Sequence, residues 1–214
     1  MKIELENILP EEIERRSFEI IESELPKDRE IDALQKPVIK RVIHTTADFD
    51  YLDNLKFSEH AVEKALTALK NGACIVTDTN MAKAGVNKTS LEKLGGVVYC
   101  YMADEDVATE AKKRGCTRAT VCMDKAAKLE KPLIIAVGNA PTALVRICEL
   151  ISEGKLKPEL VIGVPVGFVN VVQSKELMMQ AGVDYIVAAG RKGGSSVAAA
   201  ICNALIYMAT GERK

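Results

Sequence analysis

The segment Arg41–Asp50 gathers the side chains of this chain that are best suited to acid–base chemistry. It places His44, one of only two histidines, near the guanidinium of Arg41 and among hydroxyl and carboxyl groups. A histidine has an unperturbed pKa of ~6.5, so it can donate or accept a proton near neutral pH. The other histidine, His60, falls on the polar face of a predicted helix and is expected to be solvated. The sequence therefore predicts a reactive centre at His44, with a hydrogen-bonded structural histidine as the alternative.

The loop Gly190–Ser196 has the composition of an anion site. Its glycines free the backbone, Arg191 and Lys192 supply positive charge, and a helix of small residues begins near Ser195. The N–H groups at the start of that helix would favour an anion. Neither a Gly-Lys-Ser/Thr order nor a GxGxxG motif is present, which gives nucleotide binding little support. The alternative is an ordinary surface turn that caps a core helix.

Other polar residues follow apolar runs in the same way. Asp78 and Asn80 come after one such run, and Asn139 and Thr142 flank Pro141, which suits the first turn of a helix. In a parallel sheet, ligands bind outside the carboxyl ends of the strands, so these segments are expected to line one cleft. Capping and turn formation explain the same residues equally well. One carboxylate and one amide are too few ligands for a metal ion, so no protein-bound metal is predicted.

Arg118 lies in the first turn of a helix that Thr117 is predicted to cap. A cation is electrostatically unfavourable at that end of a helix unless an anion joins it. Arg118 is therefore a further, weaker candidate for anion binding.

The elements that must position these residues form a β–α alternation. Compact apolar, β-branched runs separated by helical segments are typical of a parallel sheet covered on both faces. The predicted strands are 73–77, 97–101, 133–137, 160–164 and 185–188. The expected fold is an α/β, three-layer doubly wound fold with a mostly parallel sheet. We expect one domain over residues 1–214, in which an N-terminal helical segment of about residues 1–57 packs on the α/β core.

The conformation around His44 decides which side chains act together. Residues 10–25 are predicted to be helical, with Ile13, Ile20, Ile21 and Leu25 as apolar positions. Residues 38–45 permit either a helix or a strand, and we favour the helix. On a helix Arg41, His44 and Thr45 share one face, and Asp48 would join them if the last turn continued.

Composition limits the classes of partner. A net charge of -1 and 4% aromatic residues with no Trp argue against nucleic acid or an anionic membrane. The six cysteines form no CxxC pair and no zinc-type cluster, so they are expected to be reduced core residues. No signal peptide and no apolar run long enough to span a bilayer are visible, which predicts a cytoplasmic protein.

Six collinear segments carry a resemblance to the precorrin-8X methylmutase family, in the cobalt-precorrin-8 form of the anaerobic cobalamin pathway, over nearly the whole chain. The segments are 14–18, 41–50, 78–81, 137–144, 163–169 and 190–195. The resemblance implies an isomerase that moves a methyl group from carbon eleven to carbon twelve of a corrin ring. It also implies a homodimer with active sites near the subunit interface and no cofactor, because any cobalt belongs to the substrate.

The same resemblance implies roles for individual residues. His44 corresponds to the catalytic histidine and is expected to donate a proton to the macrocycle, help that is typically worth ~10²–10⁴ in rate. The substrate carries acetate and propionate carboxylates, which Arg side chains bind well. The expected substrate-binding residues are Ser17, Arg41, Thr45, Asp78, Asn80, Arg118, Asn139, Thr142, Arg191, Lys192 and Ser195. The alternatives are a non-catalytic corrinoid carrier, which would not need His44, and a nucleotide-dependent oxidoreductase, which only the fold suggests.

Overall fold

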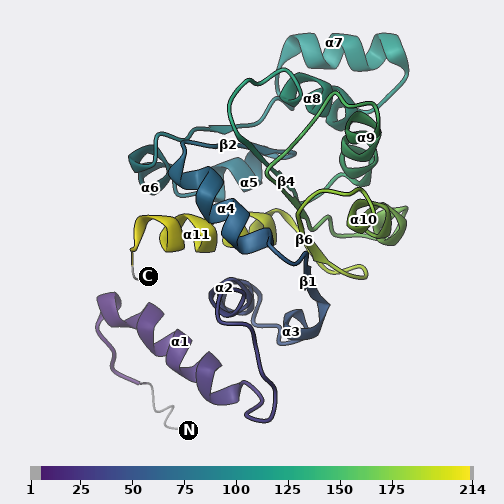
Figure 1. The fold of residues 1–214 in the computed structure, drawn as a ribbon. Coiled ribbons are helices and arrows are strands. Elements are labelled where there is room, and N and C mark those ends of the chain that lie inside the picture. Colours follow the sequence, from purple (N-terminus) through teal and green to yellow (C-terminus); the bar gives the residue numbers. More distant parts are fainter. Residues whose placement is uncertain (1–5, 213–214) are drawn as a thin grey trace, which may run out of the picture.

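Six strands form a single sheet in the order β1-β6-β5-β4-β2-β3 in the computed structural model of the protein (Figure 1). β1 (Leu55–Phe57) pairs antiparallel with β6, and the other neighbours pair in parallel. The structure describes residues 6–212; residues 1–5, which belong to the predicted N-terminal segment, and residues 213–214 lie outside the described part. The expected α/β fold with a mostly parallel sheet is confirmed.

The five predicted strands are all present, and a sixth was not predicted. The five are β2 (Cys74–Thr77), β3 (Val98–Tyr99), β4 (Leu133–Val137), β5 (Leu160–Gly163) and β6 (Tyr185–Ala188). The missed strand, β1, has only 3 residues at the edge of the sheet. So short a strand forms because β6 offers it a pairing edge, and its own sequence carries no alternation that would reveal it.

Helices cover both faces of the sheet. They are α1 (Ile13–Glu24) after a short 3₁₀ turn (Pro10–Glu12), α2 (Lys36–Thr46), α3 (Tyr51–Asn54), α4 (Ala61–Lys70), α5 (Asn80–Gly85), α6 (Lys88–Lys93), α7 (Glu105–Arg114), α8 (Arg118–Ala126), α9 (Pro141–Ser152), α10 (Val171–Met179) and α11 (Ser195–Thr210). The apolar residues of the central strands divide between two cores. Ile75 packs with α4 and α11, whereas its neighbours Cys74 and Val76 pack with α8 and α9 on the other face. This two-sided burial explains why the strands are apolar throughout.

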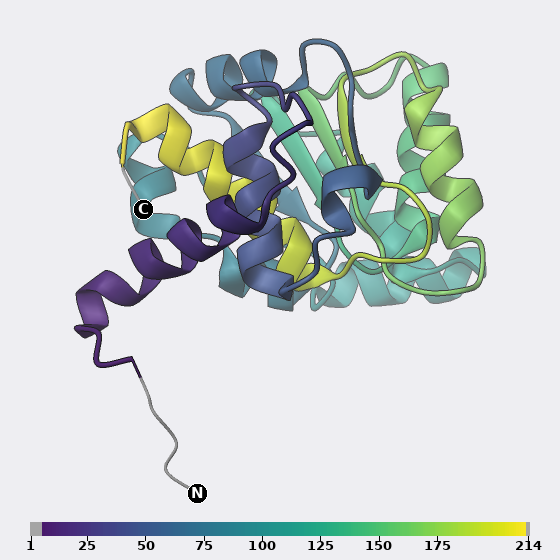
Figure 2. The same cartoon turned by 90° about the horizontal axis from the view of Figure 1, so that it is seen from below.

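The first two helices form an outer layer on one side of the molecule. α2 packs against the buried helix α11, and α1 packs against α2. In Figure 2, α1 extends outward from the body of the protein. Ile13 is 54% exposed and Ile20 is 39% exposed, so two of the four apolar positions of the predicted helix face outward. The inner face instead carries Phe18, Ile21 and Leu25, of which the last two are buried.

The segment that contains His44 is helical, as favoured from the sequence. α2 ends at Thr46, and Ala47 adopts a left-handed conformation with φ 52°. The chain therefore turns away before Asp48, which does not continue the face shared by Arg41 and His44. A helix end of this kind normally uses glycine, so its position could not be recognised from the sequence.

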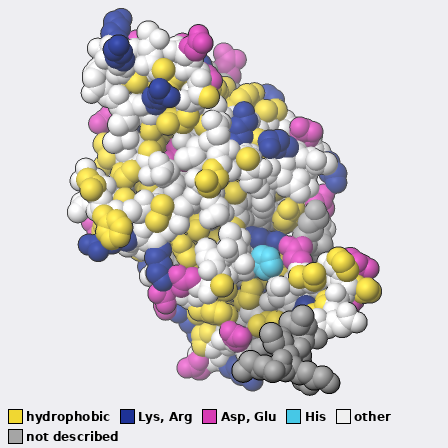
Figure 3. All heavy atoms as spheres, turned by 180° about the vertical axis from the view of Figure 1, so that it is seen from behind, with side chains coloured by type: hydrophobic (Ala, Val, Ile, Leu, Met, Phe, Trp, Pro, Cys, Tyr) yellow, Lys and Arg dark blue, Asp and Glu magenta, His cyan; other side chains and the backbone are white. Residues whose placement is uncertain are grey.

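The surface carries mixed charge. On the face shown in Figure 3, acidic and basic side chains are interspersed with apolar ones. This distribution agrees with a net charge of -1 for the whole chain. Within residues 6–212, none of the helices combines the length and the apolar character that crossing a membrane requires.

Candidate active site

α2 presents Arg41 and His44 toward the ring of Phe18 on α1. The residues Val38, Ile39, Val42 and Ile43 are buried against the core, which turns the opposite face of α2 outward. The imidazole of His44 stacks on Phe18, with ring centroids 5.0 Å apart and an interplanar angle of 11°. The guanidinium carbon of Arg41 lies 4.7 Å from the centroid of the same ring.

Arg41 is held by groups from two other helices. It forms an ion pair with Glu14 of α1, and its guanidinium carbon lies 5.3 Å from the ring centroid of Tyr207 on α11. Its side chain is only 11% exposed. A guanidinium that lies between two aromatic rings is held in one direction, because its planar face stacks on the rings.

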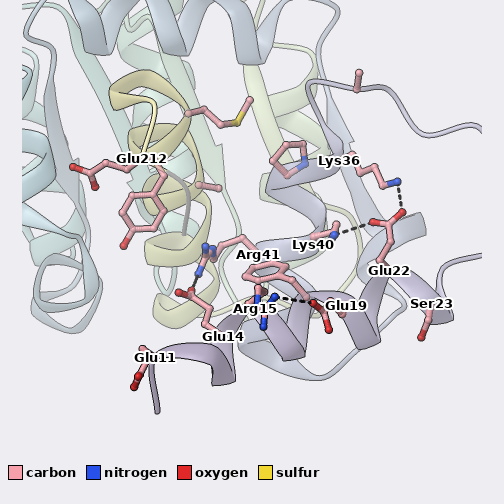
Figure 4. A pocket seen from close by; sticks show the side chains of 16 residues that line it. Glu11, Glu14, Arg15, Glu19, Glu22, Ser23, Lys36, Lys40, Arg41 and Glu212 are labelled. Atoms are coloured by element: carbon pink, nitrogen blue, oxygen red, sulfur yellow. Dashed lines mark hydrogen bonds and ion pairs between the residues drawn. The ribbon is translucent and has the colours of Figure 1, made fainter. Parts of the chain in front are cut away.

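A cavity of about 1310 Å³ opens beside these residues, between α1, α2 and α11 (Figure 4). Its wall includes Phe18, Lys40, Arg41 and Tyr207, but not His44, which stacks on the Phe18 ring. Figure 4 shows the side chains of Arg41 and Glu14 directed toward one another and in contact at this cavity. The cavity includes none of the strand-end residues that were expected to line a cleft.

The loop that follows β6 reaches the segment after His44. Lys192 donates hydrogen bonds of 2.6 Å to both Asp48 and Asp50. These contacts raise the pKa of Lys192, and the bond from Lys192 lowers the pKa of Asp48. Lys192 therefore links two segments of the protein. Arg191 is exposed, as Lys192 is, and its guanidinium carbon lies 5.3 Å from the Phe168 ring centroid.

Asp78 supports the turn after β4 and is only 1% exposed. Its carboxylate accepts three backbone hydrogen bonds, of 2.8 Å from Gly138, 2.8 Å from Asn139 and 2.7 Å from Ala140. Burial raises the pKa of Asp78, and the three N–H donors oppose that shift. The geometry corrects the expectation that Asp78 contacts a substrate, because both oxygens are occupied and the side chain is covered.

Hydroxyl groups join the other strand ends. Thr79, which caps α5, lies 2.7 Å from the hydroxyl of Ser195 at the start of α11. A Cβ on Gly138 would come within 2.7 Å of the Ser195 Cα, so only glycine permits this approach. Thr142 and Thr117 are joined through their hydroxyls at 2.8 Å, which brings Thr142 beside the turn that carries Arg118. The structure thus assembles these predicted residues at one edge of the sheet.

Several predicted residues keep an exposed surface. Asn80, Arg118, Asn139 and Thr142 are exposed at that edge. Ser17 and Thr45 donate their hydroxyl hydrogens to carbonyls of their own helices, at 2.9 Å and 3.0 Å. Their oxygens can still accept a hydrogen bond from a ligand.

Glu14, Phe18, Tyr207 and Lys175 were not among the residues predicted to form the site. Glu14, Phe18, Ile21 and Leu25 recur at helical spacing, so this face of α1 could have been found from the sequence. The contribution of Tyr207 could not, because it depends on how α11 packs beside α2. In the described part of the chain, no group of three or more His, Cys, Asp or Glu residues could hold a metal ion.

Comparison with known proteins identifies relatives along almost the whole chain. The family model described as precorrin-8X methylmutase matches residues 12–208. The cobalt-precorrin-8 methylmutase of Priestia megaterium is 43% identical over 202 residues, covering 94% of this chain and 89% of the relative. The cobalt-precorrin-8 methylmutase of Salmonella typhimurium is 45% identical over 203 residues, covering 92% and 95%. The crystal structure of precorrin-8x methyl mutase from Thermus thermophilus superposes with a TM-score of 0.86 at 39% identity, covering 94% and 98%.

Proposed function

This chain belongs to the precorrin-8X methylmutase family, and on that premise we propose that it is a cobalt-precorrin-8 methylmutase of cobalamin biosynthesis. The reaction moves a methyl group from carbon eleven to carbon twelve of the corrin ring and yields cobyrinic acid, an isomer of the substrate. The observation that carries the proposal is the arrangement of His44 and Arg41 against Phe18 beside a large cavity. A fixed cation, Arg41, lines a space large enough for a macrocycle, and the proton donor stacks on the Phe18 ring in the wall of that space.

His44 acts as the proton donor in this proposal. Migration of a methyl group between neighbouring carbons rearranges bonds within one molecule, so the enzyme has to polarise the ring and hold it rigidly. Stacking on Phe18 fixes the plane of the imidazole and leaves its ring nitrogens at the edge of the stack. His44 protonates the macrocycle near the migrating group and recovers the proton when the methyl group has moved.

The exposed and half-buried cations bind the carboxylates around the macrocycle. Arg41, Arg118 and Arg191 have the planar donor sets that suit carboxylates. Hydrogen bonds from Ser17, Thr45, Asn80, Asn139, Thr142 and Ser195 supplement them. Lys192 and Asp78 contribute indirectly, since Lys192 is paired with two carboxylates and Asp78 is buried.

The protein acts as a homodimer in this proposal, with the second copy covering the outer face of α1. That face exposes Ile13 at 54%, and Leu9 just before it is 59% exposed. Apolar residues gathered on a projecting helix are typical of an interface. Sedimentation of the wild type and of an Ile13→Glu variant tests the assignment. We expect a dimer for the wild type and dissociation for the variant, and a monomeric wild type would overturn it.

The test of activity is an anaerobic incubation of the purified protein with cobalt-precorrin-8. The absorbance spectrum follows the reaction, and mass spectrometry and NMR identify the product. Conversion to cobyrinic acid at unchanged mass is expected. Spectral change on binding without formation of the isomer would instead favour a corrinoid carrier.

Cobalt enters this proposal as part of the substrate, and the reaction consumes no methyl donor or redox cofactor. A parallel incubation with the metal-free tetrapyrrole tests the choice of substrate. Faster turnover of the metal-free compound would overturn the assignment to the cobalt-containing pathway.

The cytoplasmic location expected from the sequence stays a prediction.

A further inference from the structure

Lys175 on α10 is a buried lysine that the mechanism above does not use. It is 1% exposed. Its ammonium donates hydrogen bonds of 2.8 Å to the carbonyl oxygen of Gly190 and 2.8 Å to that of Lys192. Among residues 6–212, no acidic side chain forms an ion pair with it. A buried charge without a counter-ion is costly, so its hydrogen bonds to the backbone must be well formed.

The two carbonyls belong to the cationic loop, defined here as Gly190–Gly194. The opposite side of this loop is tied to the β5–α10 connection. Gly167 donates a 3.1 Å bond to the carbonyl of Arg191, and Gly194 donates a 2.8 Å bond to the carbonyl of Val164. Successive carbonyls of the loop are thus held in opposite directions, by Lys175 on one side and by Gly167 on the other.

The fit of the loop leaves little freedom for any other arrangement. Gly190 adopts φ +80°, and a Cβ on Gly193 would lie 2.1 Å from the carbonyl oxygen of Val164. The loop therefore passes directly over the β5–α10 connection, where side chains are excluded. On the inner side of the loop, Lys175 supplies the hydrogen bonds that the carbonyls of Gly190 and Lys192 would otherwise need from backbone N–H groups.

This backbone path determines where the two cations of the loop point. Arg191 lies at the surface over the ring of Phe168, and Lys192 reaches Asp48 and Asp50, just beyond the helix of His44. Burial lowers the pKa of Lys175 to about 8, so the ammonium is still charged at neutral pH and donates strongly to both carbonyls.

We propose that Lys175 is a positioning residue, whose buried ammonium fixes the cationic loop so that Arg191 meets a carboxylate of the tetrapyrrole substrate. The role of Arg191 rests on the function proposed above. The control of the loop by Lys175 rests on the hydrogen bonds alone and can be tested without substrate.

The first experiment measures the loop itself. Trypsin cleaves after Arg191 and Lys192, and mass spectrometry identifies both cuts. In the full-length Lys175→Met variant, which leaves two carbonyls without their donor, we expect cleavage in the loop at least 10-fold faster than in the wild type. The control is Lys64→Met, which removes a lysine paired with Asp184 in front of β6. Cleavage at the wild-type rate in Lys175→Met would overturn the proposal.

The second experiment asks whether Lys175 acts through Arg191. The dissociation constant of cobyrinic acid is measured by absorbance titration for the wild type, Lys175→Met, Arg191→Ala and the double variant. We expect each single change to weaken binding roughly 10-fold and the double variant to be little weaker than either, because coupled residues are not additive. Fully additive losses would overturn the proposal, since they would mean that Lys175 supports the fold without directing Arg191.

A third measurement uses only the wild type and keeps the proposal testable if Lys175→Met does not fold. Reductive methylation should spare Lys175 in the folded protein while it modifies exposed lysines such as Lys88. Rapid methylation of Lys175 would overturn the proposal. Failure of the wild type to isomerise cobalt-precorrin-8 would refute the proposed function, whereas the trypsin result stands separately.

Discussion

Two regions of the molecule carry the candidate site residues, and they are held together by different kinds of contact. The helical region around Phe18, Arg41 and His44 depends on rings and ion pairs between side chains that remain partly open to solvent. The carboxyl edge of the sheet depends on buried polar side chains, Asp78 and Lys175, that bond to backbone groups.

This difference indicates a division of tasks. A half-buried side chain can meet a ligand, and replacing it leaves few buried groups without partners. A buried charge that holds several backbone groups cannot meet a ligand, but its removal leaves those groups unsatisfied. We therefore expect substitutions in the helical region to change activity more than stability, and substitutions at the sheet edge to do the reverse.

Replacing His44 should have the largest effect. His44→Asn removes the proton donor, so we expect kcat to fall by roughly 10²–10⁴ with little change in the free energy of unfolding. Turnover of cobalt-precorrin-8 and urea denaturation measure the two quantities. His60→Asn, at the exposed second histidine, is the matched control and should retain full activity. Equal loss of turnover and of tetrapyrrole binding in His44→Asn would contradict its role as proton donor.

Replacing Asp78 should mainly destabilise the protein. Asp78→Ala leaves three backbone N–H groups, of which that of Gly138 is buried, without their acceptor, so we expect the free energy of unfolding to fall by roughly 3 kcal/mol. Urea denaturation of the variant measures this loss. Asp106→Ala is the control, because its carboxylate is 68% exposed in an ion pair with Lys125, and its effect on the free energy of unfolding should be much smaller. A loss for Asp78→Ala as small as that of the control would remove the contrast between the two regions.

Lys175 should make the stability of the fold depend on pH in the alkaline range. Its pKa is about 8 in the folded protein, against 10.5 for an ordinary lysine. Between these values the unfolded chain binds more protons, so the free energy of unfolding should rise with pH, by at most about 3 kcal/mol. Below pH 8 Lys175 is charged in the folded protein as well, so this gain in the free energy of unfolding is absent.

The measurement is a series of urea denaturations between pH 7.5 and about 10.5, on the wild type and on Lys175→Met. We expect the difference in stability between the two proteins to change with pH in favour of the wild type. Parallel curves over the whole range would show that Lys175 does not titrate in this interval.

Replacing Phe18 should have the smallest effect of the four. Phe18→Leu keeps apolar volume but removes the ring that contacts both His44 and Arg41. Aromatic and cation–π contacts contribute about 1 kcal/mol each, so loss of both should lower kcat/KM roughly 30-fold. Steady-state kinetics at fixed pH measures this change. Ile20→Leu, on the exposed side of the same helix, should match the wild type. If the free energy of unfolding falls by more than the free energy that corresponds to the change in kcat/KM, Phe18 has a mainly structural role.

The sequence predicted most of the sheet but not all of it. Runs such as Leu133–Val137 and Leu160–Gly163 are apolar at every position because both faces of the sheet are covered, and this pattern is local. β1 has no such pattern. It becomes a strand only because it pairs with β6, so its conformation cannot be predicted from its own residues.

The candidate site was predictable in part for the same reason. His44 and Arg41 were recognised from the types and spacing of residues in one helix. The roles of Asp78 and Lys192 were not, since a carboxylate or an ammonium in the sequence does not reveal whether it faces a ligand or another part of the chain. The distances to Gly138, Asp48 and Asp50 answer that question for these two residues.

The amino-acid sequence by itself determined the α/β class, the five strands β2 to β6, the helix that carries His44 and the family to which the chain belongs. These depend on periodicity, composition and motifs that recur within short segments. Only the tertiary structure decided that Phe18 stacks on His44, that Lys192 binds Asp48 and that Lys175 lies beneath the cationic loop. Each of these contacts joins segments distant in sequence, and its energy depends on burial and direction, which exist only once the chain has folded.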